Sequence, residues 1–168
     1  GEIIEVGDGV EKFRLGDRVV SNGHHAEIVS VPKNLCARIP DNVSNAQASF
    51  VVLSAIALQG IRLANLTIGE RVAVIGLGAI GLMAVQILIA HGCTVLAFDL
   101  NDDRLQLAKS FGASIINSSE EEAKVVIDNF TSGFGMDAVI ITAASKGNEI
   151  IQQAAKMSRK RGRIILVG

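Results

Sequence analysis

The stretch AVIGLGAIGLMAV, residues 73–85, places three glycines, Gly76, Gly78 and Gly81, inside an apolar run. The apolar residues before the glycines predict a buried strand, and those after them predict a helix. At this spacing the first glycine allows a tight turn, the second lets the backbone approach a pyrophosphate, and the third lets the helix pack against the strand. The plain alternative is a strand, a turn and a close-packed helix without a ligand.

Strand-like and helix-like segments alternate along the chain from residue 71 onward. This alternation is typical of a parallel sheet with right-handed crossovers, so the sequence predicts an α/β fold, a doubly wound parallel sheet of the Rossmann type. Polar caps and glycine stops mark the helices between the strands. The expected strands are RVAVI (71–75), CTVLAFD (93–99), SIIN (114–117), DAVIIT (137–142) and GRIILVG (162–168), with helix caps at Asn101 and at Ser118 or Ser119, and helix ends at Gly92 and Gly112.

The residues before residue 71 have a different sequence pattern. Residues 1–40 contain short apolar runs broken by turn residues, which predicts small antiparallel β structure with strands such as AEIVSVP (26–32). Residues 44–66 predict one helix that Ser44 caps, with Gln47 completing a capping box. Because its apolar positions are nearly continuous, we expect this helix to be largely buried.

A helix that begins directly after the glycines offers backbone amides to an anion. The amides of Leu77, Gly78, Ala79 and Ile80 would point at a pyrophosphate from the positive end of the helix. Asp99 follows the glycines at close to the spacing of about 20 residues expected for a ribose-binding acid. Its carboxylate would accept hydrogen bonds from ribose hydroxyls and repel a 2′-phosphate, which favours NAD over NADP. The alternative is a capping or solvated acid at a strand end.

Composition and charge exclude several classes of function. Apolar residues make up 49% of the chain, so it is not a disordered protein, and a net charge of −1 offers no basic field for nucleic acid or anionic lipid. No segment is long and apolar enough to predict a membrane span, and no signal-peptide pattern is present. Cys36 and Cys93 have no metal-ligand spacing and predict small buried side chains in a reducing compartment. We therefore expect a cytoplasmic protein with no nucleic-acid or membrane partner.

Several stretches together resemble the medium-chain dehydrogenase/reductase superfamily, the zinc-type alcohol dehydrogenase-like proteins. They are GEIIEVGDGVEKFRLGDRVV (1–20), HAEIVSVPKNLCARIPDNVS (25–44), GERVAVIGLGAIGLMAVQIL (69–88), DDRLQLAKSFGA (102–113) and GRIILVG (162–168). The resemblance implies the end of a GroES-like catalytic domain at residues 1–43, a linker helix at 44–66 and an NAD(P)-binding Rossmann domain at 67–168 without its last strand. SNGHHAEIVSVPKNLC (21–36) and AIALQGIR (55–62) further resemble a bacterial subgroup of bi-domain oxidoreductases.

The resemblance also implies which residues bind the cofactor. Asp99 and Arg104 would hold the adenosine ribose, residues 142–144 would line the adenine and ribose, and residues 167–168 would approach the nicotinamide. Packing at strand ends is the alternative for the last five positions. The complete expected set is Gly76, Leu77, Gly78, Ala79, Ile80, Gly81, Asp99, Arg104, Thr142, Ala143, Ala144, Val167 and Gly168.

The chain departs from the family pattern where zinc would bind. The third catalytic zinc ligand of the family would fall near Val52, and the threonine that contacts the nicotinamide would fall near Ile56. SNGHHAE (21–27) stands where a four-cysteine zinc loop would follow. Because zinc needs several correctly spaced nitrogen or sulfur ligands, we expect a zinc-free enzyme similar to the quinone and enoyl reductase branches.

The resemblance implies an NAD(P)-dependent oxidoreductase that transfers hydride to or from a small molecule and forms a homo-oligomer in its full-length form. Both ends of the chain look cut, so we expect a piece of a longer protein. Its catalytic residues should then lie elsewhere, and we expect this piece to be inactive alone. Two rivals are an NAD-sensing regulatory module without chemistry and a flavin-binding Rossmann domain. The β segment at the start favours the enzyme over the sensor.

Three sets of polar residues have a simpler interpretation than catalysis or ligand binding. His24 and His25 could supply a general acid or base, but no acid that orients them is evident, and a solvated turn is favoured. Lys109 and the basic run KMSRKRGR (156–163) are expected to be solvated. Residues 120–122, three glutamates, are expected in the first turn of a helix.

Overall fold

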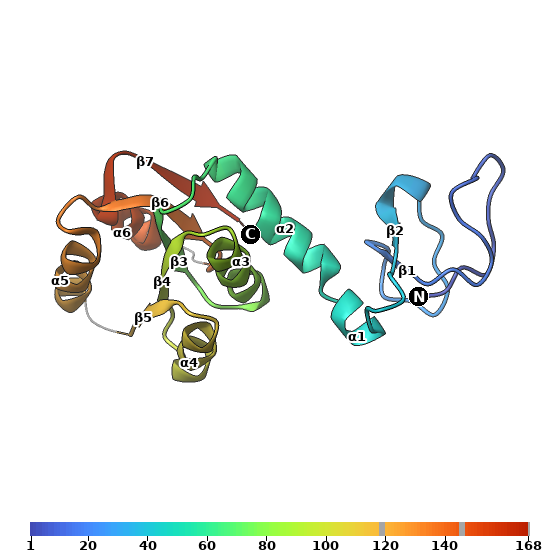
Figure 1. Ribbon diagram of the computed structural model, residues 1–168, viewed down its shortest axis with the longest axis horizontal. Coiled ribbons are helices and arrows are strands. Elements are labelled where there is room, and N and C mark those ends of the chain that lie inside the picture. Colours follow the sequence, from blue (N-terminus) through green and yellow to red (C-terminus); the bar gives the residue numbers. More distant parts are fainter. Residues whose placement is uncertain (118–119, 145–146, 168) are drawn as a thin grey trace. The chain divides into compact units, whose positions relative to one another are not determined.

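The computed structural model describes residues 1–117, 120–144 and 147–167, with the backbone alone at residues 120–122 (Figure 1). The chain divides into two compact units, Gly1–Val52 and Leu53–Gly168. In the first unit β1 (Val19–Ser21) pairs antiparallel with β2 (Cys36–Arg38), which follows the short 3-10 helix η1 (Lys33–Leu35). The strand expected at AEIVSVP is wrong: residues 26–32 pair with no strand of the described residues, and most of them are exposed.

The helix expected at residues 44–66 is two helices, α1 (Asn45–Ala48) and α2 (Val51–Ala64). The capping box at its start is confirmed, because the Gln47 amide donates to Ser44 Oγ at 3.2 Å and the Ser44 amide donates to Gln47 Oε1 at 2.9 Å. The two helices meet at Ser49 and Phe50, where the regular helical bonding of α1 ends.

The expected burial of this segment is wrong for most of α2. Helix α2 buries one narrow face made of small and branched residues, Ala57, Gly60, Ile61 and Ala64. These positions recur at i, i+3, i+4 and i+7, so they form one stripe along the helix. The apolar residues on its other faces stay accessible, and Leu63 exposes 67% of its surface.

The second unit is built on a parallel five-stranded sheet with the order β5-β4-β3-β6-β7. The strands are β3 (Arg71–Ile75), β4 (Thr94–Phe98), β5 (Ser114–Ile116), β6 (Met136–Ile141) and β7 (Ser158–Leu166). The helices between them are α3 (Ala79–Ala90), α4 (Asp102–Ser110), α5 (Glu120–Thr131) and α6 (Glu149–Met157). This is the expected Rossmann-type α/β arrangement, and the chain reverses its direction of travel across the sheet between β3 and β6.

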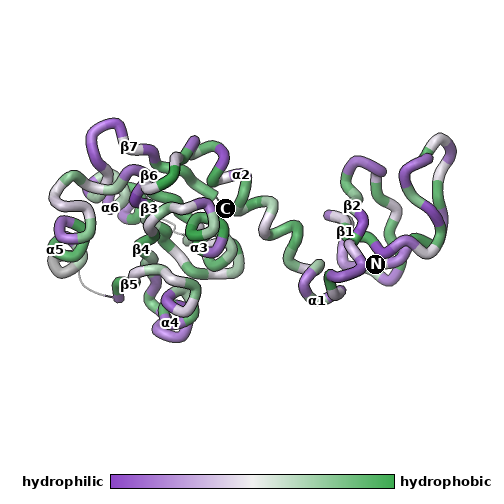
Figure 2. Tube along the Cα trace, viewed as in Figure 1, coloured by the Kyte–Doolittle hydropathy of each residue, from purple (hydrophilic) through white to green (hydrophobic). Residues whose placement is uncertain are grey.

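Two apolar layers enclose the sheet, because successive residues of each strand point to opposite faces. On one face Val72 and Val74 of β3 pack with α2, α3 and α4. On the other face Ala73 and Ile75 pack with α5 and α6. Figure 2 shows the central strands of this unit as hydrophobic and the beginning of β7 as hydrophilic.

The local signals in the second unit agree with most of the expected boundaries. Asn101 caps α4, since its side chain accepts the Arg104 amide at 3.0 Å, and Gly112 ends that helix with φ +104°. Ser118 and Ser119, the expected caps of α5, lie outside the described residues. Within the part of the chain that the structure describes, no helix has the length and apolar character that crossing a bilayer requires.

Candidate functional site

The glycine turn lies at the carboxyl end of β3, where the direction of the chain across the sheet reverses. Gly76 has φ +92°, a backbone conformation that favours glycine, and a Cβ atom there would lie 2.7 Å from the Ala143 nitrogen. A Cβ atom on Gly81 would overlap the carbonyl oxygen of Gly76. Both glycines are therefore required by close packing within the protein itself.

Gly78 differs from the two other glycines of the turn. Its φ is −66°, which any residue adopts, and a Cβ atom there would meet no heavy atom of the described residues within 4 Å. It caps α3, so the backbone amides of the first turn, from Ala79 onward, follow directly. Those amides lack partners inside the helix. An open space in front of such a helix end fits an anionic group.

The backbone amide of Leu77 has a partner that the sequence analysis did not anticipate. It donates to Asp99 Oδ2 at 2.6 Å, while the Asn101 amide donates to Asp99 Oδ1 at 2.9 Å. The expectation that the Leu77 amide points at a pyrophosphate therefore differs from the structure, because the carboxylate at the end of β4 already accepts its hydrogen. The amides of Gly78, Ala79 and Ile80 remain for an anion.

Asp99 lies at the centre of the next part of the site. Its side chain is 10% exposed, and the Arg104 guanidinium lies 3.8 Å from Oδ2. The carboxylate therefore links β4 to the glycine turn and faces α4 at the same time. Each carboxylate oxygen accepts one backbone amide and keeps further acceptor capacity, so a ribose hydroxyl can still donate to it.

Of the three residues after β6, two pack against the glycine turn and one is exposed. The Thr142 hydroxyl donates to the Gly76 carbonyl oxygen at 2.6 Å, and Ala143 is the residue against which Gly76 packs. Ala144 is exposed. Thr142 and Ala143 thus hold the turn in place, and of the three only Ala144 presents a side chain mainly to solvent.

The two residues expected on the nicotinamide side have different outcomes. Val167 is 9% exposed, belongs to the apolar layer on the α2 face, and donates its amide to the Ile141 carbonyl at 2.8 Å. Gly168 lies outside the described residues.

Sequence reasoning missed Leu100, which follows Asp99 directly. Its side chain is 96% exposed, more than that of any other large apolar residue in the described part of the chain. An apolar residue in the otherwise polar stretch DLNDD (99–103) was the available signal. Beside a ribose-binding acid it offers an apolar surface to a flat base.

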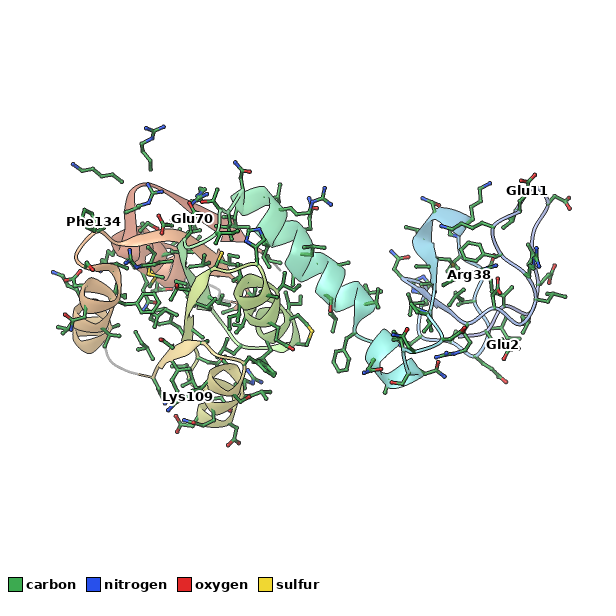
Figure 3. All side chains as sticks on the ribbon, in the orientation of Figure 1. Glu2, Glu11, Arg38, Glu70, Lys109 and Phe134 are labelled. Carbon is green, nitrogen blue, oxygen red and sulfur yellow. The ribbon has the colours of Figure 1, made fainter. Side chains whose placement is uncertain are left out.

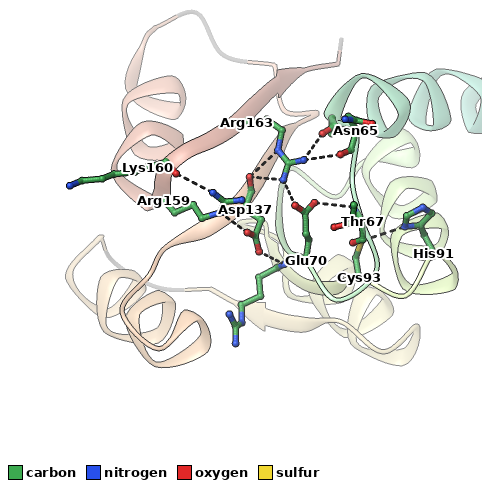
Figure 4. Close-up of polar contacts among 11 residues, drawn as sticks. Asn65, Thr67, Glu70, His91, Cys93, Asp137, Arg159, Lys160 and Arg163 are labelled. Atoms are coloured by element: carbon green, nitrogen blue, oxygen red, sulfur yellow. Dashed lines mark hydrogen bonds and ion pairs between the residues drawn. The ribbon is translucent and has the colours of Figure 1, made fainter.

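The expectation that the basic run at 156–163 is solvated is wrong for two of its arginines. Arg159 Nε lies 2.5 Å from Asp137 Oδ1, and Arg163 Nη2 lies 2.6 Å from Glu70 Oε1 (Figure 4). All of this run from Ser158 onward lies within β7, which begins at Ser158 rather than at residue 162. These pairs gather at the amino ends of β3, β6 and β7, at the opposite end of the sheet from the glycine turn.

Two ionisable groups of this polar cluster have shifted pKa values. Burial would raise the pKa of Asp137, but hydrogen bonds from the Arg71 amide and Arg159, with the charges of Arg159 and Arg163, lower it below its ordinary value. Burial, helped by the charges of Glu70 and Asp137, raises the pKa of the Cys93 thiol. This shift favours the neutral thiol form of Cys93 at neutral pH.

The remaining polar residues singled out from the sequence are peripheral. His24 and His25 are exposed in the first unit, which agrees with a solvated turn. Lys109 is exposed on α4 and extends outward in Figure 3. Cys36 is half-buried rather than buried. Among the residues described, no three His, Cys, Asp or Glu side chains gather as a metal site would require.

Comparison with known proteins gives consistent results. The family model described as zinc-binding dehydrogenase matches residues 79–168. The (R,R)-butanediol dehydrogenase of Bacillus subtilis (strain 168) is 31% identical over 99% of this chain and 56% of its own length. The solved structure of the alcohol dehydrogenase TADH from Thermus sp. ATN1 is 28% identical, with a TM-score of 0.90 over 100% of this chain and 59% of that one. The chain thus spans just over half the length of these relatives.

A second similar solved structure contains a nicotinamide dinucleotide. A mycobacterial protein solved in complex with NADPH is 26% identical, with a TM-score of 0.82 over 98% of this chain and 53% of that one.

Proposed function

The chain belongs to the zinc-binding dehydrogenase family, within the medium-chain dehydrogenase/reductase superfamily, and on that premise we propose that its turn at residues 76–81 binds a nicotinamide dinucleotide for hydride transfer. The observation that carries the proposal is the open space at Gly78. Nothing in the packing of the described residues requires a glycine there, whereas a pyrophosphate close to the backbone does.

The residues around the turn supply binding and orientation. The pyrophosphate would lie against the amides of Gly78, Ala79 and Ile80, and Asp99 would accept hydrogen bonds from a ribose. The exposed side chain of Leu100 would pack on the adenine. The bound cofactor supplies the hydride chemistry, and the chain positions it at the carboxyl edge of the sheet. The substrate is a small molecule that the whole protein would position.

We expect Asp99 to favour NAD over NADP. Asp99→Asn keeps one oxygen that can accept the Leu77 amide, loses the acceptor of the Asn101 amide, and removes the charge that repels a 2′-phosphate. NADP should then bind about tenfold better relative to NAD, equivalent to about 1.4 kcal/mol. Titration calorimetry of both cofactors, at low and moderate salt, measures this ratio. A wild-type chain that binds NADP as well as NAD would show that Asp99 is only a structural acceptor for Leu77 and Asn101.

The family name implies zinc, but no donor set among the described residues fits it. Structural zinc sites need four ligands in tetrahedral geometry, and the described residues bring no such group together. Val52 and Ile56, at the positions where the family resemblance implies a zinc ligand and a threonine, are both apolar. We expect the purified chain to hold substoichiometric zinc by metal analysis. One equivalent of zinc that His24→Ala or His25→Ala removes would overturn this expectation.

The similar proteins are dehydrogenases, and none of those compared favours a regulatory module without chemistry. Assembly into a homo-oligomer, the GroES-like assignment of residues 1–43 and membership of the bi-domain subgroup remain predictions. The sequence on either side of this segment would test the last two.

A further inference from the structure

The C-terminal end of α2 is fixed to the sheet by one arginine. Arg163 Nη1 donates to the carbonyl oxygens of Ala64 and Asn65, both at 2.9 Å. Its other nitrogens donate to Glu70 Oε1 and to the Asp137 carbonyl oxygen, so all five N–H groups have acceptors. A cation at the carboxyl end of a helix also interacts favourably with the helix dipole. This end of α2 therefore has a defined position along β7.

A second contact between α2 and the end of β7 lies at Gly60, four residues before the last residue of the helix. A Cβ atom on Gly60 would lie 2.5 Å from Val167 Cγ2 and 3.8 Å from Ile165 Cγ2. Gly60 has no positive φ, so its backbone does not require glycine. The glycine instead allows α2 to approach the last residues of β7 closely, with Val167 filling the space a side chain would occupy.

Val167 follows the carboxyl end of β7, at the edge of the sheet where the glycine turn lies. The Thr142 amide donates to Ile75 and the Val167 amide donates to Ile141, so β3, β6 and β7 end side by side. A dinucleotide lies across the point where the strand order reverses. If Asp99 holds one ribose on the β4 side, the other half of the molecule would extend toward β6 and β7.

We propose that Gly60 is a positioning residue for the nicotinamide end of the cofactor, acting through Val167. The close contact fixes how far α2 lies from the end of β7, and thereby sets the backbone that the nicotinamide would meet. This inference rests on the proposed dinucleotide site, because it concerns one half of that ligand. It assigns a role to a residue in the linker helix that is outside the glycine motif.

The experiment compares NADH with ADP-ribose, which lacks only the nicotinamide. In Gly60→Ala the new methyl group displaces α2 or the end of β7. NADH affinity should fall about tenfold, because small misplacements at a site are costly, while ADP-ribose affinity stays within about twofold of wild type. Val167→Ala alone serves as the control, and Gly60→Ala combined with Val167→Ala should restore NADH affinity to within about threefold.

The outcomes separate the positioning role of Gly60 from the dinucleotide site itself. Equal losses for both ligands, or unchanged NADH affinity in a folded Gly60→Ala chain, would overturn the positioning role while leaving the dinucleotide site in place. A wild-type chain that binds neither ligand would instead overturn the proposed function, and this inference with it. Melting curves establish folding. If Gly60→Ala does not fold, Val167→Leu, whose longer side chain crowds the same contact from the β7 side, replaces it with the same expected result.

Discussion

Gly81→Ala should destabilise the chain by about 3 kcal/mol and lower its melting temperature by roughly 10 °C. Glycine to alanine inside a helix ordinarily stabilises by up to about 1 kcal/mol, so the expected sign is reversed. The reason is steric, because the alanine Cβ would overlap the Gly76 carbonyl oxygen and lie 2.7 Å from Thr142 Oγ1. Relief would require α3 to move away from the strand it covers.

The matched control for this substitution is Gly78→Ala, three residues earlier in the same turn. A Cβ atom there meets no described atom within 4 Å, so its melting temperature should stay close to that of wild type. Circular dichroism melts of the three proteins measure both effects. If Gly81→Ala were as stable as Gly78→Ala, the close packing at the start of α3 would not exist in solution.

Arg163→Met should have the second-largest effect, a loss of about 2–3 kcal/mol in the free energy of unfolding. Methionine keeps the apolar stem but leaves the Glu70 carboxylate and the Ala64 carbonyl without the guanidinium. The Glu70 side chain is only 15% exposed, so water compensates poorly, and the estimate lies between those for buried and surface pairs.

The control is Lys160→Met, which also replaces a basic residue of β7 by methionine, but at an exposed position. Urea unfolding of the two variants should show a loss for Arg163→Met and almost none for Lys160→Met. Arg163→Lys should fall between them, because an ammonium group cannot reach all the acceptors of the guanidinium fork. Equal stability of the two methionine variants would mean that the polar cluster in Figure 4 contributes nothing to the fold.

Local chemistry accounts for what could be predicted from the sequence. The caps at Ser44 and Asn101 depend on residues within a few positions of one another. The strands and helices of the Rossmann-type unit follow from apolar periodicity in the same way. The connection rules for parallel strands predict the right-handed crossovers between them, but not the order of the strands in the sheet.

Contacts between distant residues account for what could not be predicted. Arg163 is 93 positions from Glu70, so its place in an apparently solvated basic run conceals an ion pair. Leu77 and Asp99 are 22 positions apart, and nothing local indicates that one accepts the amide of the other. Residues 26–32 show the opposite case. Their sequence resembles a strand locally, but they form none because no described segment pairs with them.

The central claim is that the space at Gly78 accommodates a dinucleotide pyrophosphate, and Gly78→Val tests it most directly. The φ of −66° and the open surroundings allow valine without strain, so the melting temperature should hardly change. The side chain would occupy the space of the ligand, and NADH affinity by titration calorimetry should fall at least about a hundredfold, equivalent to about 2.7 kcal/mol. Equal NADH affinities for wild type and Gly78→Val, both folded, would contradict the account.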